Sequence, residues 1–175
     1  MSATDFEAPV DRDFLLGLNV PPYPPGVEDL AWSLIHNERG EPYGQNPRSK
    51  YGRRQHEWRL DHVRIGGRPA LFLLRNLTLD LEPITVRDLD LGVQRTSVWR
   101  IEDVLVLPVY DAEERIELSR CWDPQGELVV GLGVYRQELS TIRPVRAAWA
   151  LDLQEARLVE ADPTEIRCRS PFGPV

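Results

Sequence analysis

The feature that most constrains the fold is a series of short alternating segments, separated by turn signals, that begins near residue 56. The strand-like runs are residues 56–65, 69–79, 97–110, 116–122, 127–135, 145–153, 157–161 and the short 166–168. Alternation with a period of two places apolar side chains on one face of a strand. Gly66 and Gly67 separate the first two runs, as in a tight hairpin. We therefore predict a mainly β fold, an antiparallel barrel or sandwich of about seven to eight strands with one short N-terminal helix.

The predicted domain organisation has three parts. Residues 1–26 are expected to form an irregular, proline-rich lead-in, residues 27–170 a single β-rich domain, and residues 171–175 a tail. The helix is expected at residues 27–35, where apolar residues recur at the helical spacing; a strand over residues 30–35 is the alternative. Residues 37–55 lack apolar periodicity and are expected to form a long basic loop.

Four prolines flank Tyr23 in the segment VPPYPPG. Such a segment cannot form a helix or a central strand and favours an extended polyproline II conformation. It is interpreted as a strap that lays Tyr23 on the domain surface, with a recognition peptide for an aromatic groove as the alternative.

The charge is acidic overall and unevenly distributed. The net charge is −7, and 20 of the 21 basic residues are arginine, which is typical of a GC-rich, bacterial genome. Residues 39–75 carry a net charge of +6, between residues 1–38 and 80–117, which each carry −6. These segments either neutralise one another in the fold or polarise the surface toward a charged partner. The acidic balance argues against nucleic-acid binding, which uses a basic surface.

The two cysteines, Cys121 and Cys168, have no metal or redox spacing. The N-terminus does not resemble a signal peptide, and no apolar run is long enough for a membrane helix. We therefore expect a soluble, cytoplasmic protein with reduced cysteines and no membrane association.

Motifs for catalysis and cofactor binding are missing from the sequence. It has neither a GxSxG elbow nor a glycine-rich phosphate loop. His56 and His62 are six residues apart, which is about 20 Å along a strand, so they are not expected to bind one metal ion. Gly131 and Gly133 lie inside a strand-like run and indicate a bulge or close packing. No cofactor and no metal site are predicted.

The leading functional hypothesis is a small protein-interaction module, in its specific form an inhibitor or immunity-type protein. An acidic face would attract the partner and a tryptophan would anchor it. The predicted contact residues are Asp88, Asp90, Trp99, Glu113 and Glu114. The partner is expected to be another protein; the sequence does not indicate the oligomeric state.

Two alternatives are retained. The first is a β-barrel that binds a small apolar ligand among Trp58, Phe72 and Trp149. The second is an enzyme of unidentified reaction that uses His56, His62 and Asp61. The basic loop also has the residue types for phosphate contact, and its cations are Arg48, Lys50, Arg53 and Arg54.

Overall fold

The computed structural model describes residues 11–36, 57–77 and 98–171. Two five-stranded antiparallel sheets dominate these residues, with strand orders β1-β5-β4-β3-β2 and β10-β6-β7-β8-β9. The strands of the first sheet are β1 (Asn19–Val20), β2 (Val27–Leu34), β3 (Trp58–Ile65), β4 (Arg68–Asn76) and β5 (Trp99–Val106). Those of the second are β6 (Glu114–Trp122), β7 (Leu128–Arg136), β8 (Thr141–Asp152), β9 (Arg157–Ala161) and β10 (Arg167–Cys168).

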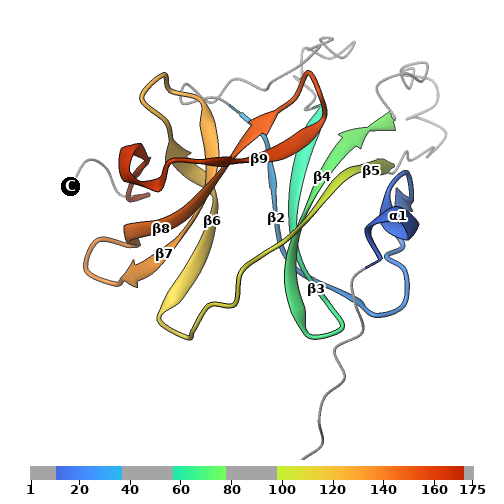
Figure 1. Cartoon of the computed structure of the whole chain (residues 1–175), viewed down its shortest axis with the longest axis horizontal. Helices are drawn as coiled ribbons and strands as arrows, with labels where there is room; N and C mark the ends of the chain where they lie inside the picture. The colour runs from blue at the N-terminus through green and yellow to red at the C-terminus, as the bar shows by residue number, and fades with distance from the viewer. Residues whose placement is uncertain (1–10, 37–56, 78–97, 172–175) are drawn as a thin grey trace, which may run out of the picture.

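The first sheet lies between the second sheet and the N-terminal segment, residues 11–26. The helix α1 (Arg12–Leu15) of that segment lies on the side of the first sheet that faces away from the second sheet (Figure 1). Two apolar clusters follow from this arrangement. The inner cluster lies between the sheets and includes Leu60, Leu73 and Leu132. The outer cluster lies under the N-terminal segment and includes Val20, Phe72 and Ile101. Because both faces of β4 are covered, five consecutive residues of that strand are buried.

The prediction of a mainly β, antiparallel fold is confirmed. Strands β3 to β9 coincide with the predicted runs, and the β3–β4 hairpin turns at Gly66 and Gly67, which have φ of 54° and 84°. Both values lie in the left-handed region that glycine adopts without steric cost. The predicted number of strands was too low, because β1 and β2 add to the predicted runs and bring the described total to ten.

The prediction of a helix over residues 27–35 is wrong, because residues 27–34 form β2 and pair with β3. The strand alternative was the better interpretation. The apolar residues of this segment are divided between the two clusters: Val27 and Leu34 pack against the outer one, whereas Ile35 belongs to the inner one. The short helix that does occur is α1, within the segment expected to be irregular. No helix in the described residues is long and apolar enough to span a membrane.

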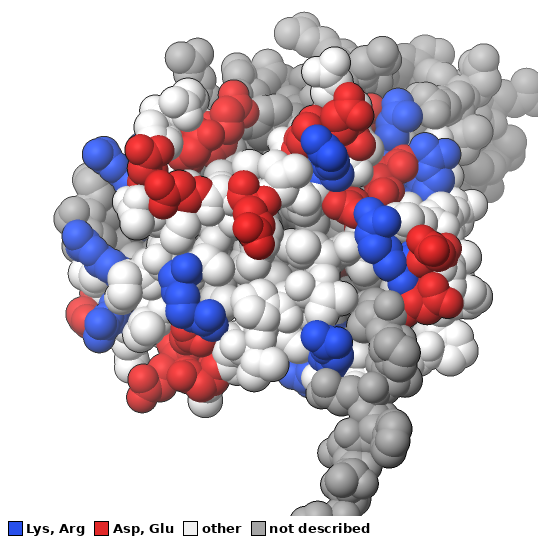
Figure 2. All heavy atoms as spheres, viewed as in Figure 1, with Lys and Arg blue, Asp and Glu red and all other residues white. Residues whose placement is uncertain are grey.

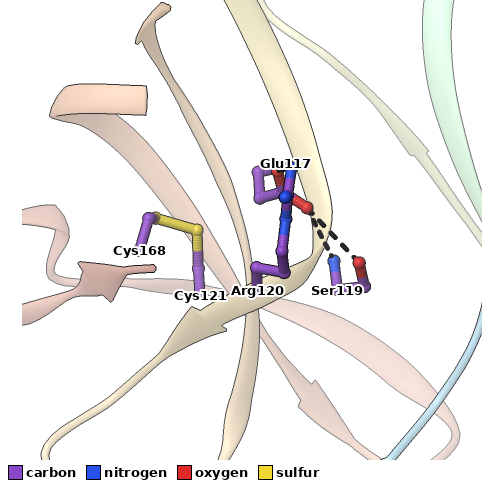
Figure 3. The surroundings of a disulfide bond; sticks show 5 residues. All are labelled: Glu117, Ser119, Arg120, Cys121 and Cys168. Carbon is purple, nitrogen blue, oxygen red and sulfur yellow. Dashed lines mark hydrogen bonds and ion pairs between the residues drawn. A yellow bond between two sulfur atoms is a disulfide. The ribbon is translucent and has the colours of Figure 1, made fainter. Parts of the chain in front are cut away.

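The expectation of reduced cysteines is also wrong. Cys121 on β6 and Cys168 on β10 are direct partners in the β6–β10 pairing and form a disulfide (Figure 3). Their Cα atoms are 4.0 Å apart. Cys121 is fully buried, and the bond attaches the two-residue strand β10 to the second sheet.

Close packing at the predicted glycines is confirmed. The pairing of β7 with β8 shifts register on both sides of Gly133. A Cβ atom at Gly133 would overlap the backbone carbonyl of Pro144. The missing side chain at this position therefore allows two backbones to approach each other.

Candidate functional site

A buried ion pair lies on the face of β3 that carries the outer cluster. The Arg59 Nε and an amino group of its guanidinium donate to the two carboxylate oxygens of Asp61, at 2.5 and 2.8 Å. The Asp61 side chain has no exposed surface, and that of Arg59 is 14% exposed. Alternate residues of a strand share a face, so Arg59 and Asp61 are neighbours by sequence position alone. The bidentate geometry fixes the plane of the guanidinium.

Tyr23 completes this polar cluster from the proline-rich strap. Its hydroxyl donates to Asp61 and accepts a hydrogen bond of 2.9 Å from Arg59. Burial, with the hydrogen bond to Asp61, raises the pKa of Tyr23 above its ordinary value. The interpretation of the strap is supported, because Tyr23 is half-buried and packs against the outer cluster.

Arg59 also lies between two tryptophan rings. Its guanidinium carbon is 5.1 Å from the ring centroid of Trp32 and 5.4 Å from that of Trp99, both within the range of a cation–π contact. The two rings differ in exposure: Trp99 is 5% exposed, whereas Trp32 is 56% exposed. Trp32 is therefore a surface tryptophan whose ring is held from beneath by an immobilised arginine.

Trp32 lies on β2, the last strand in the order of the first sheet. Among the described residues, β2 pairs with β3 alone, and all five residues from Glu28 to Trp32 are exposed. The pairing of β2 with β3 is irregular between Asp29 and Ala31, and Leu30 at that point is 36% exposed. An edge strand of this kind presents backbone N–H and C=O groups that can pair with another chain.

Both charged residues of β2 are acidic. Glu28 lies 3.4 Å from Arg64 in an exposed pair, which is a weak interaction in water. Burial raises the pKa of Asp29, and the charge of Asp61 adds to this shift while Arg59 opposes it. The edge therefore combines an apolar anchor with negative charge.

The polar groups of this cluster are largely occupied by one another. The described residues contain no group of three or more histidine, cysteine or acidic side chains that could hold a metal ion. The carboxylate of Asp61 is already committed to Arg59 and Tyr23. What this edge offers to another molecule is a fixed aromatic ring beside backbone hydrogen-bonding groups.

The structure describes three of the five residues predicted to form the acidic face, and they differ in burial. Trp99 is buried in the outer cluster, so it cannot serve as an exposed anchor. Glu114 accepts two hydrogen bonds from Arg146, at 2.6 and 3.0 Å, whereas Glu113 is exposed. Asp88 and Asp90 lie outside the described residues. On the face seen in Figure 2, acidic and basic side chains are intermixed.

The residues of the two alternatives are not brought together. Trp58 and Trp149 belong to the inner cluster but Phe72 belongs to the outer one, on the opposite face of the first sheet, so the three do not line one cavity. His62 contacts the Tyr110 hydroxyl at 3.1 Å on the face of β3 opposite to Asp61. His56 and the cations at residues 48, 50, 53 and 54 lie outside the described residues.

Sequence reasoning missed Trp32 and Arg59. The alternation of Arg59 and Asp61 along β3 was the available signal for the ion pair. Trp32 joins them because it pairs directly with Asp61 across β2 and β3, and directly paired residues point to the same side. No protein-family model, curated protein or solved structure matches the chain.

Proposed function

We propose that this protein is a protein-interaction module that binds an extended, positively charged segment of a partner protein along β2. The observation that carries the proposal is Trp32, a large exposed side chain whose ring packs against the guanidinium of Arg59. Tryptophan is enriched among the residues that contribute most to protein interfaces. A ring that is already immobilised loses little conformational entropy on binding.

The edge position of β2 supports the expected mode of binding. An extended peptide can add a strand to an open sheet edge, where main-chain hydrogen bonds provide affinity and side-chain contacts provide specificity. The acidic side chains of Glu28 and Asp29 favour lysine or arginine in the bound segment, because complementary charge speeds encounter and selects the partner. An inhibitor or immunity-type role is the specific form of this function expected from the sequence.

A random peptide library displayed on phage and selected on the full-length protein tests this proposal. The selected peptides should be rich in lysine or arginine, and W32A should weaken their binding more than 10-fold. Truncation of a hot-spot residue costs about 2 kcal/mol or more, which corresponds to roughly 30-fold in affinity. W32F should retain part of the affinity, and circular dichroism should show that both variants keep the wild-type content of β structure.

Charge reversals locate the interface. The E28K/D29K variant should lose binding of the basic peptides, whereas E113K, a reversal at an exposed acid outside β2, should keep it. Loss of binding in E113K with retention in E28K/D29K would move the interface to the predicted acidic face. Peptides that bind wild type and W32A equally would refute the role of the β2 edge.

The disulfide bears on where this binding takes place. Disulfides persist in oxidising compartments and are rare in the cytoplasm. We therefore infer that the protein works in an oxidising compartment rather than in the expected cytoplasmic location. Alkylation of the unreduced protein from its source cells should leave Cys121 and Cys168 unmodified, and free thiols at both positions would refute this placement.

A further inference from the structure

A cavity of about 460 Å³ is lined by residues of the second sheet and the segments next to it. One wall is the end of β6 and the turn that follows it, from Trp122 to Gly126. The other wall comes from η2 (Pro163–Glu165) and the segment around β10. Two stretches about 40 residues apart in the chain thus form one concave site.

The disulfide joins the two walls of this cavity. Cys121 directly precedes Trp122, and Cys168 lies between Arg167 and Arg169, both of which line the cavity. The backbone N–H of Arg169 donates to the carbonyl of Arg120 at 2.9 Å and continues the pairing beyond β10. The walls are therefore fixed relative to each other before any ligand arrives, which lowers the cost of binding.

Arginine side chains dominate one wall of the cavity. The guanidinium of Arg169 lies 5.2 Å from the ring centroid of Trp122, and Arg167 is exposed close to it in the chain. Trp122 packs against the inner cluster, and its indole nitrogen is buried without a hydrogen-bond partner among the described residues. This N–H is therefore not itself presented to a ligand, but it belongs to a residue that lines the cavity.

The two acidic residues of the lining differ in their availability. One carboxylate oxygen of Asp123 accepts hydrogen bonds from the backbone N–H groups of Gln125 and Glu127, both at 2.9 Å. These two hydrogen bonds stabilise the turn that follows β6. Glu165 is exposed on the opposite wall, in the short helix η2.

We propose that this cavity binds a small oxyanion, a carboxylate or a phosphate group, through the guanidinium group of Arg167. Guanidinium groups bind both kinds of anion in bidentate fashion. The site goes beyond the proposed function, since it lies on the other sheet and takes a different class of ligand.

Titration of the full-length, oxidised protein with inorganic phosphate and, separately, with acetate at constant ionic strength tests the proposal. The readout is the indole N–H resonance of Trp122 in a ¹H–¹⁵N spectrum, assigned from its loss in W122F. Saturable displacement of this resonance is the expected result. Tighter binding of phosphate assigns the phosphate class, and tighter binding of acetate assigns the carboxylate class.

A pair of charge-matched variants separates a built site from general charge attraction. R167Q should weaken binding at least 10-fold, whereas R143Q, which removes an exposed arginine of β8 outside the cavity lining, should leave the affinity unchanged. An equal effect of the two variants, or a Trp122 resonance that neither anion displaces, would overturn the proposal.

Discussion

Removal of the disulfide should lower the free energy of unfolding by about 4 kcal/mol. The bond joins residues that are 47 positions apart in the chain. In the chain-entropy treatment, closing a loop of that length costs the unfolded state roughly 14 cal/mol/K, or about 4 kcal/mol at 25 °C. The expected loss is large because the total stability of a domain is only about 5–15 kcal/mol.

The variant for this test is C121A/C168A. Alanine at both positions leaves no buried hydroxyl without a partner, which serine at the fully buried Cys121 would do. Urea unfolding, followed by tryptophan fluorescence, measures the free energy of unfolding of the oxidised protein and the variant. The dependence of this free energy on urea concentration must also be compared, because a cross-link changes the compactness of the unfolded chain.

Reductant provides the matched control. It should destabilise the wild-type protein to about the level of C121A/C168A and leave the variant unchanged. A variant within 1 kcal/mol of the oxidised wild type would refute the reasoning. Such a result would mean that β10 unfolds separately from the rest of the sheet, so that the cross-link does not restrict the cooperative unit.

Three further predictions concern the sheets. D61N should cost about 3–5 kcal/mol in urea unfolding because it leaves the buried Arg59 guanidinium without its counter-ion, and the double variant R59M/D61L should recover part of this loss. Burial lowers the pKa of His62 below its ordinary value of 6.5. The unfolded chain therefore binds the proton first, and the free energy of unfolding falls as the pH drops below 6.5. Thermal melts at a series of pH values should show a smaller fall in the melting temperature of H62Q than in that of the wild type. G133A should cost about 1–3 kcal/mol or more in the same urea assay because the new methyl group meets the backbone carbonyl of Pro144, whereas G131A, whose methyl group meets only side-chain atoms, should cost less.

The parts of the fold that could be predicted from sequence depend on local patterns. Strands β3 to β9 alternate apolar and polar residues or end at glycine-containing turns, and those signals are present within a few residues. β2 was misassigned because its apolar residues also fit a helical spacing. The spacing could not show that this segment pairs with β3 and divides its apolar side chains between two clusters.

The candidate site depends on pairings that are distant in the chain. Arg59 and Asp61 could be placed on one face from their spacing, but Trp32 reaches them only through the register of β2 against β3. The disulfide likewise follows from the pairing of β10 with β6, across 47 residues. The pattern of neighbouring residues does not determine the register between strands that are distant in the chain. These features could therefore be found only in the structure.

Part of the uneven charge of the sequence is neutralised by ion pairs between distant segments of the chain. Arg12, in the acidic first segment, donates to the buried carboxylate of Asp103 at 2.6 Å, and Asp103 also accepts from the backbone N–H of Leu158 at 2.7 Å. Asp103 therefore joins α1, β5 and β9. Acidic residues of the middle segment are therefore used in folding, and their number in the sequence overstates the negative surface.

The two proposed sites use the same device, a tryptophan ring held by an arginine, once on each sheet: Trp32 by Arg59 and Trp122 by Arg169. Because the sites lie on different sheets, their effects should be independent. W32A should leave phosphate or acetate affinity unchanged, and R167Q should leave peptide binding unchanged, when both are measured on the same preparations. A variant that lost both activities would show that it had damaged the shared fold, and neither loss could then be assigned to its site.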